Sequence, residues 1–356
     1  MPSLPAFDVN RNECHNPHVV ILGAGASLAA APKGDRNGLR LPSLQNVAEV
    51  VGITDLIDRC QAKYGPLGTG FEEIYSNLIS QGAAQGEVEQ INRAVRAYFA
   101  RLQLPDHLTA YDYLVLGLRE KDAIFTFNWD PFLLQAYFRC SGTAKLPNLY
   151  FLHGNVGIGV CETCKIKGNA GLSCAKCGQP FAEVDLLYPV KQKNYAATAL
   201  LQNEWKALND YLNNAYFITI FGYSAPVTDV EARSRFIDAF RTNPSREFAE
   251  VEIIDIRDRA DIERTWEDFF FEHHYGVFPD ISHSQIYRHF RRSCDAFAMA
   301  TLQCNPVPEH SPQGITDIEG LKGFAGLLHD EERHHLKFWR NHTNPFGPSA
   351  DTKKTP

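Results

Sequence analysis

The sequence contains no hydrophobic run long enough to cross a bilayer. Its longest uncharged stretches, residues 19–32 and 215–228, fall short of the ~20 apolar residues that a membrane-spanning helix needs, and both contain glycine or proline. Residues 1–15 carry Pro, Asp and Glu where a secretory signal has a basic start and an apolar run. We therefore expect a cytoplasmic protein that does not contact membranes.

The chain also lacks a strong excess of either charge. Its 35 Lys and Arg residues against 42 Asp and Glu residues give a formal net charge of −7, so direct binding to nucleic acid is not expected. The 25 glycines and 20 prolines are an ordinary share of 356 residues, which excludes collagen-like and low-complexity classes. A hydrophobic fraction of 44% indicates a globular protein with a sizeable core.

Nine cysteines cannot all pair, and in a reducing compartment free thiols or metal ligands are expected rather than disulfides. Two CxxC pairs, separated by nine residues, together supply four thiolates: Cys161, Cys164, Cys174 and Cys177. Four thiolates complete a closed tetrahedral Zn²⁺ site, so we expect one structural zinc per chain. A redox-active CxxC pair is the alternative, although no thioredoxin-like context surrounds either pair. The others are expected to be free thiols: Cys14, Cys60, Cys140, Cys294 and Cys304.

Five short apolar runs, each bounded by Gly, Asn or Asp, predict strands buried on both faces. They span residues 18–25, 123–128, 148–154, 216–224 and 250–258. Segments with helical periodicity lie between them. This alternation predicts an α/β fold with a Rossmann-like, doubly wound parallel sheet.

Two stretches interrupt the alternation inside a predicted core domain of residues 18–258. Residues 33–120 are mostly helical in pattern and predict a helical insertion, whereas residues 155–190 hold the CxxC pairs and predict a small zinc ribbon. Residues 259–343 predict a helical C-terminal extension, and residues 344–356 a disordered tail.

An Arg- and His-rich segment of that extension, residues 284–304, has an apolar face beside a basic one. The simplest interpretation is packing on the main domain with a solvated basic edge. Contact with a second copy of the chain or with a partner protein is the alternative.

The first predicted strand ends in a glycine-rich turn, Gly23-Ala24-Gly25-Ala26-Ser27, before a segment that can start a helix. Glycines allow a tight turn and a close approach of backbone to ligand, so the helix N-terminus can present N–H groups to a diphosphate. A turn that needs glycine only for its geometry is the alternative. The departure from GxGxxG disfavours an ordinary dehydrogenase.

Polar residues follow three further strands, and ligands of open parallel sheets bind at the carboxyl ends of strands. Asn128 and Asp130 follow the second strand, His153 the third, and Gly222 and Ser224 the fourth. His153 is a candidate general base, and the Asn128 amide can bind a sugar hydroxyl or a water molecule. The structural alternatives are a strand-end turn for Asn128, a helix N-cap for Asp130 and a core position for His153.

In this order, the motifs GAGAS, TFNWD, LHGN, CxxC…CxxC and GYSAPVTD resemble those of the sirtuin superfamily, whose members bind NAD on a Rossmann-like domain with a small zinc module. The closer resemblance is to divergent bacterial sirtuin-like proteins, many of them in antiphage defence systems, which carry TFNYD-type and GYSxPxTD-type motifs. Residues 186–195, LLYPVKQKNY, also resemble that branch. The resemblance spans residues 18–257.

The resemblance implies a role for each motif residue. The NAD diphosphate and adjoining ribose would be held by Gly23, Ala24, Gly25 and Ser27. The nicotinamide-ribose pocket would include the two catalytic residues Asn128 and Asp130, with His153 as the catalytic base. The adenosine half would contact Gly222, Ser224 and, at the end of the fifth strand, Asp255, where sirtuins usually have Asn.

Two departures from protein-deacylating sirtuins direct the functional expectation. The chain lacks the Asp-Phe-Arg stretch of their cofactor loop, and it has Phe127-Asn128 in place of Gln-Asn. We therefore expect an NAD⁺ glycohydrolase that releases nicotinamide and ADP-ribose and depletes NAD⁺ in antiphage defence, as a homo-oligomer or with a partner protein of the same system. The alternatives are an NAD-dependent protein-lysine deacylase and a non-catalytic module that binds NAD or ADP-ribose.

Overall fold

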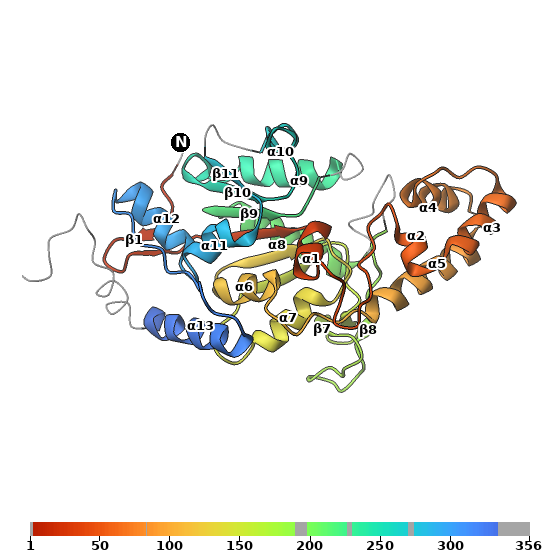
Figure 1. The fold of residues 1–356 in the computed structure, drawn as a ribbon, viewed down its shortest axis with the longest axis horizontal. Helices are drawn as coiled ribbons and strands as arrows, with labels where there is room; N and C mark the ends of the chain where they lie inside the picture. The colour runs from red at the N-terminus through yellow and green to blue at the C-terminus, as the bar shows by residue number, and fades with distance from the viewer. Residues whose placement is uncertain (1–2, 83, 189–197, 226–229, 270–273, 334–356) are drawn as a thin grey trace, which may run out of the picture.

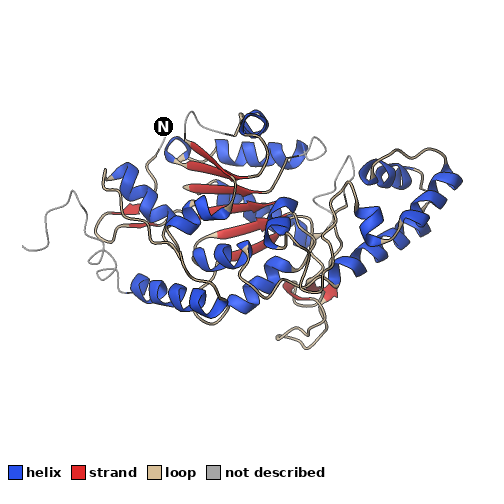
Figure 2. Cartoon of the chain, in the orientation of Figure 1, coloured by secondary structure: helices blue, strands red, loops and turns tan. Residues whose placement is uncertain are grey.

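The computed structural model describes residues 3–82, 84–188, 198–225, 230–269 and 274–333. At the centre of these residues is a six-stranded sheet in which every neighbouring pair of strands is parallel (Figures 1 and 2). Its strands are β3 (His18–Leu22), β4 (Ala123–Thr126), β5 (Asn148–Phe151), β9 (Phe217–Phe221), β10 (Glu250–Ile254) and β11 (Tyr275–Phe278). This sheet confirms the predicted α/β class.

The strand order is β5-β4-β3-β9-β10-β11. Numbered along the chain within this sheet, the order is 3-2-1-4-5-6, which is that of a Rossmann fold. The chain reverses its direction of travel across the sheet between β3 and β9, where Leu22 lies opposite Phe221. Ligands of doubly wound sheets bind outside the carboxyl ends of the strands at this switch point.

Side chains alternate along β3 between two hydrophobic cores. Val20 and Leu22 belong to one core, and Val19 and Ile21 to the other, and all four are fully buried. The first core is covered by α1 (Ala24–Ala30), α6 (Ala110–Gly117), α7 (Phe132–Cys140), α11 (Gln285–Arg288) and α13 (Ile318–Arg333). The second is covered by α8 (Ala199–Leu212), α9 (Val230–Arg241), α10 (Arg259–Trp266) and α12 (Ser293–Leu302).

The long segment between α1 and β4 is helical. Its first helices form a lobe that projects from one end of the molecule (Figure 1): α2 (Val47–Val51), α3 (Thr54–Tyr64), α4 (Phe71–Ser80) and α5 (Gln85–Ala100). Helix α6, at the end of the segment, instead returns to the sheet and packs beside α7 and α1. The segment therefore contributes both a lobe and one of the helices that cover the sheet.

A small antiparallel sheet of order β7-β6-β8 contains the first cysteine pair. Its strands are β6 (Ile158–Cys161), β7 (Ile166–Asn169) and β8 (Ala182–Glu183). Lys167 fixes it to the edge strand β5, because its Nζ donates to Leu149 O (2.8 Å) and to the buried carboxylate of Glu204 (3.0 Å). Glu204 in turn accepts from Phe151 N (2.6 Å). This ion pair covers backbone groups of an otherwise open sheet edge.

The C-terminal part differs from the predicted helical extension in two respects. It adds β11 to the sheet, a strand whose four residues are only half buried and are interrupted by Gly276, so it lacks the continuous apolar run that predicts the other strands. The predicted solvated basic edge of residues 284–304 is also wrong at Arg291 and Arg292, which are 2% and 5% exposed. Arg291 donates to Leu118 O (3.0 Å) at the C-terminal end of α6 and pairs with Glu332 (2.8 Å).

The remaining elements are short. They are a hairpin of β1 (Phe7–Asp8) and β2 (Glu13–Cys14) and two 3₁₀ turns, η2 (Arg246–Phe248) and η3 (Ile281–His283). No helix among the described residues is both long and apolar enough to span a membrane. The predicted tail, residues 344–356, and the end of the extension, residues 334–343, lie outside the described residues.

Candidate functional site

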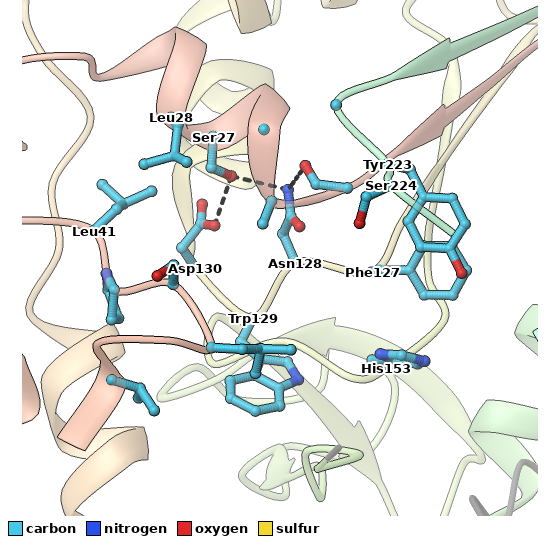
Figure 3. Close-up of a pocket in the computed structure, with 18 of the residues that line it drawn as sticks. Ser27, Leu28, Leu41, Phe127, Asn128, Trp129, Asp130, His153, Tyr223 and Ser224 are labelled. Carbon is cyan, nitrogen blue, oxygen red and sulfur yellow. Dashed lines mark hydrogen bonds between the residues drawn. The ribbon is translucent and has the colours of Figure 1, made fainter. Parts of the chain in front are cut away.

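A cavity of about 380 Å³ opens at the carboxyl ends of β3, β4 and β9, at the switch point of the sheet (Figure 3). All ten residues that the sequence predicts for catalysis and cofactor binding line it: Gly23, Ala24, Gly25, Ser27, Asn128, Asp130, His153, Gly222, Ser224 and Asp255. The structure therefore brings together residues from five separate strand ends. Part of the GYSAPVTD motif, residues 226–229, lies outside the described residues. The same holds for residues 189–195 of the LLYPVKQKNY segment.

The turn after β3, at Gly23 and Gly25, and the turn after β9, at Gly222, form the floor of the cavity and are in direct backbone contact. Glycine is needed at these positions because a Cβ atom would clash with the facing backbone. Gly25 N donates to Gly222 O (2.9 Å), and a Cβ on Gly23 would lie 2.5 Å from the same oxygen. Gly222 has a φ of +61°, and a Cβ there would lie 2.3 Å from Ala26 N. The Ala26 amide also donates to Gly23 O (3.0 Å). Gly23 N also donates to Phe221 O (3.0 Å), so the backbone amides of Gly23 and Gly25, which the sequence assigns to a diphosphate, are engaged within the protein.

One wall of the cavity is a buried hydrogen-bonded cluster around the Ser27 hydroxyl (Figure 3). The hydroxyl donates to Asp130 Oδ2 (2.7 Å). Because a hydroxyl has one proton to donate, its contact with the Tyr111 hydroxyl (2.6 Å) is one in which Tyr111 donates. Asn128 Nδ2 donates to the same Ser27 oxygen (2.9 Å) and also lies 3.1 Å from the Tyr111 oxygen.

These contacts fix the orientation of the Asn128 side chain. Its amide nitrogen also donates to Gly23 O (2.8 Å), so both amide protons are used inside the protein. The backbone on either side is held as well, because Asn128 N donates to Thr126 Oγ1 (3.0 Å) and Asn155 Nδ2 donates to Asn128 O (3.1 Å). The side-chain carbonyl oxygen of Asn128 is the group left for a ligand or a water molecule.

Asp130 is a buried carboxylate with an altered proton affinity. It is 4% exposed, and burial raises its pKa to about 6, while the hydrogen bond from Ser27 acts in the opposite direction. Its other oxygen accepts from Phe132 N (3.1 Å) at the start of α7. Asp130 therefore lies in the cavity wall and also accepts from the first backbone amide of α7, although the N-cap residue of that helix is Pro131, one position later than predicted.

Aromatic rings form the adjoining wall. Phe127 stacks on Tyr223 with ring centroids 4.5 Å apart and planes 15° apart, and His153 meets the same Phe127 ring edge-on at 4.6 Å. His153 is 7% exposed and lies beside Phe127, away from the Ser27 and Asp130 side of the cavity (Figure 3). Its carbonyl oxygen accepts from Leu187 N (2.9 Å), which connects its loop to the segment that follows the small antiparallel sheet.

Asp255 lies at the cavity edge, after β10, but its carboxylate is already engaged. Arg257 donates to it from its backbone N (2.9 Å) and from its side-chain Nε (3.0 Å). A ribose hydroxyl at Asp255 would share the carboxylate with this arginine. Arg257 also lines the cavity and brings a positive charge that the sequence analysis did not include.

Two kinds of residue at the site were not predicted from the sequence: one behind the cavity wall, and several that line the cavity. Tyr111 belongs to the apolar helical segment of α6, where its pattern is that of an ordinary core residue. The cavity is also closed by residues that follow no strand: Leu41, Pro42, Ser43, Leu44, Gln45, Val47 and Phe99. Only the three-dimensional packing of the lobe against the sheet places them there.

The four cysteines of the CxxC pairs come together away from the cavity residues. The sulfur atoms of Cys161, Cys164, Cys174 and Cys177 all lie within 4.8 Å of one another. A tetrahedral Zn²⁺ ion with Zn–S bonds of ~2.3 Å requires sulfur atoms about 3.8 Å apart. The donor set and its spacing fit a zinc ion with no open coordination position, and such an ion stabilises a small sheet that has little core of its own.

No protein-family model matches the chain, and no curated protein matches it in sequence. Solved structures similar to it include Sir2 in complex with the inhibitor EX-527, 2′-O-acetyl-ADP-ribose and deacetylated p53 peptide, which is 15% identical with a TM-score of 0.38 over 81% of this chain and 93% of that chain. Sir2Tm bound to a propionylated peptide is 17% identical with a TM-score of 0.34 over 74% and 87%. These similarities are at low identity and do not assign an activity.

Proposed function

We propose that this chain is a sirtuin-like enzyme that binds NAD⁺ in the switch-point cavity and hydrolyses the bond between nicotinamide and ribose. The observation that carries the proposal is the convergence of nine motif residues and Asp255, from five strand ends, on one cavity. The motif order supports NAD⁺ as the ligand. The cavity has the size of a small-molecule site and is closed by residues 41–45 and by Val47 and Phe99 of the lobe.

Hydrolysis breaks the bond between C1′ of the ribose and the nicotinamide nitrogen, and positive charge moves onto the ribose. Asp130, with a pKa of about 6, is mostly ionised at neutral pH and stabilises that charge. The fixed carbonyl oxygen of Asn128 orients the attacking water, and His153 takes the proton as the oxygen bonds to C1′. Nicotinamide leaves with the bonding electron pair.

The test is to incubate the purified chain with NAD⁺ and to measure nicotinamide and ADP-ribose for the wild type, Asn128→Ala and His153→Ala. The assay is run with and without an extract of phage-infected cells, so that an enzyme that needs an activating ligand is detected. We expect cleavage by the wild type and its loss in both variants. His283→Ala, which changes an exposed histidine of η3, is the control and should cleave at the wild-type rate.

The same assay separates the alternatives. If NAD⁺ stays intact without a peptide and is consumed only together with an acetyl-lysine peptide, the chain is a deacylase. If the chain binds NAD⁺ or ADP-ribose without consuming either, and Asn128→Ala and His153→Ala leave its biological output unchanged, it is a binding module. Either result rejects hydrolysis.

The motif resemblance also supports a biological role for this reaction, depletion of NAD⁺ in antiphage defence. In bacteria that express the chain, NAD⁺ should fall during phage infection and plaque numbers should drop. With Asn128→Ala expressed at the same level, both effects should disappear. Protection that persists with the variant would contradict this role.

A further inference from the structure

Tyr111 lies outside every motif that suggested the site, yet its hydroxyl lies inside the polar cluster. The residue belongs to α6, is fully buried, and contacts both Ser27 (2.6 Å) and Asn128 (3.1 Å). Those two residues come from different elements, the start of α1 and the end of β4. The Tyr111 hydroxyl therefore contacts both members of the hydrogen-bonded pair Ser27 and Asn128 (2.9 Å).

Helix α6 holds this hydroxyl at a fixed place. At its N-terminal end, a capping box joins Thr109 and Asp112, and Arg139 of α7 donates to Asp112 Oδ1 (2.6 Å). At its C-terminal end, the buried Arg291 donates to Leu118 O (3.0 Å). A helix tied at both ends gives the Tyr111 ring little freedom to move.

The surroundings of the hydroxyl exclude acid or base chemistry at Tyr111. The residue has no exposed surface, and it is not among the residues that line the cavity. Burial and the charge of Asp130 also raise its pKa well above the usual value for tyrosine. Its hydroxyl remains protonated and acts on a ligand only through the groups that it contacts.

We propose that Tyr111 is a positioning residue: its hydroxyl donates to Ser27 and thereby holds the Asn128 amide with its carbonyl oxygen toward the cavity. The chain of donors runs from Tyr111 to Ser27 and from Ser27 to Asp130. With both Ser27 lone pairs taken by Tyr111 and Asn128, the Asn128 amide has one satisfied orientation. In its kinetic part, this inference rests on the proposed hydrolysis of NAD⁺.

The kinetic test uses Tyr111→Phe, which removes one oxygen atom and leaves the ring in place. Tyr216→Phe is the matched control, because Tyr216 is also fully buried, its hydroxyl is hydrogen-bonded to Thr301 (2.9 Å), and neither residue lines the cavity. We expect a kcat for NAD⁺ about tenfold lower in Tyr111→Phe with KM within about twofold of the wild type, and no change in the control. An unchanged kcat in Tyr111→Phe overturns the proposal.

A double-mutant cycle tests the route through Ser27. If Tyr111 acts by way of Ser27, the double variant Tyr111→Phe, Ser27→Ala should be no slower than Ser27→Ala alone. Additive losses in kcat would show that Tyr111 acts independently of Ser27 and would overturn the proposed route. The Ser27→Ala variant also supplies a comparison if Tyr111→Phe folds poorly.

A second readout needs no enzymatic activity. In protein labelled with ¹⁵N-asparagine, the Asn128 side-chain amide is assigned by its loss in Asn128→Ala. We expect its resonances to shift or broaden in Tyr111→Phe and Ser27→Ala and to stay in place in Tyr216→Phe. Unmoved resonances in Tyr111→Phe overturn the positioning role. If the wild type does not cleave NAD⁺, the proposed function fails while this measurement still decides the role of Tyr111.

Discussion

One serine hydroxyl joins a buried carboxylate and a buried amide at the proposed active site. Ser27 donates to Asp130 and accepts from Asn128, so the charge of one residue and the orientation of the other depend on the same atom. In the proposed hydrolysis the two groups would have different tasks, because Asp130 would stabilise positive charge and Asn128 would orient water. The cluster supplies electrostatic preorganisation, in which dipoles and charges are in place before the reaction begins.

The pH dependence of the reaction should report Asp130. Its pKa is raised to about 6, so the carboxylate ionises as the pH rises through that value. We expect kcat/KM for NAD⁺ to increase from pH 5 to pH 7 with an acid limb near 6. The same ionisation has the opposite effect on stability: a raised pKa contributes stability at low pH, and this is lost as the pH rises through about 6. A rate that is constant from pH 5 to pH 7 would contradict this role.

A single methyl group at Gly222 should disrupt the cavity floor. In Gly222→Ala the new Cβ would lie 2.3 Å from Ala26 N, and the residue would keep a φ of +61° that costs ~1–2 kcal/mol outside glycine. We expect a lower unfolding temperature and loss of NAD⁺ binding by calorimetry. Gly171→Ala is the control for backbone strain alone, because Gly171 has a φ of +80° with open space around its Cβ position. Equal behaviour of the two variants would contradict the close approach of the turns.

At the scale of single residues, the site residues that directly follow strands could be predicted from the sequence. Asn128 and His153 could be placed at one edge because parallel strands end at the same side of a sheet. Tyr111 could not, because nothing in an apolar helix distinguishes a buried tyrosine with a polar partner from one that only fills space. The burial of Arg291 was not predicted for a related reason. A basic residue next to an apolar face is usually solvated. The carbonyl oxygens that accept from the Arg291 side chain belong to distant residues, Leu116, Leu118 and Lys145.

At the scale of elements, the small antiparallel sheet is attached to the loop after β5 that carries His153. The segment after β8 returns past His153, where Leu187 N donates to His153 O (2.9 Å) and Leu187 itself lines the cavity. Lys167 fixes β7 to the edge strand that leads into the same loop. The position of His153 therefore depends on an element that a zinc ion at the four cysteines would stabilise.

Zinc content and activity should change together. We expect about one zinc per chain, and both Cys161→Ser and Cys174→Ser should lose the metal, unfold at a lower temperature and cleave NAD⁺ more slowly. Cys304→Ser, which changes an exposed cysteine outside the cluster, should keep the metal and the rate. Metal analysis with thermal unfolding and NAD⁺ cleavage checks this. A zinc-free Cys161→Ser or Cys174→Ser variant that is as stable as the wild type would contradict the assignment of a structural zinc.

A second buried network joins β3, β9, β10 and α12. His18 contacts Ser293 Oγ and Thr219 Oγ1, each at 2.7 Å, and the Thr219 hydroxyl donates to Glu252 (2.6 Å). Burial lowers the pKa of His18 to about 3, so the ring is neutral in the folded chain at ordinary pH. The network ties the C-terminal helices to the sheet without charge on the histidine.

Low pH should therefore destabilise the folded chain by favouring protonation of His18. Because its folded pKa lies below the unfolded value of about 6.5, its contribution to stability is present above pH 6.5 and is lost as the pH falls toward 3, at up to ~1.4 kcal/mol per pH unit. His18→Gln, which stays uncharged, should be less stable than the wild type at pH 7 but lose less stability between pH 6 and pH 4. Denaturant unfolding at several pH values measures this, and parallel pH profiles for the two proteins would argue against it.

At the scale of the whole molecule, the Rossmann strand order places the site. Five of the six strands and their parallel arrangement followed from apolar runs alternating with helical segments, whereas β11 did not, because four half-buried residues give no distinctive pattern. The closure of the cavity by the lobe was equally unpredictable. Leu41 and Phe99 are far apart in sequence and reach the cavity only through packing.

The most direct test of the account is the stoichiometry of NAD⁺ cleavage in the absence of any peptide. Purified chain, with the infected-cell extract as activator where needed, is incubated with NAD⁺ at neutral pH, and nicotinamide and ADP-ribose are quantified by chromatography. The account predicts equal amounts of both products from the wild type and a loss of at least about a hundredfold in Asn128→Ala that is still folded. Intact NAD⁺ in the absence of an acyl-lysine peptide, or cleavage by Asn128→Ala at the wild-type rate, would contradict it.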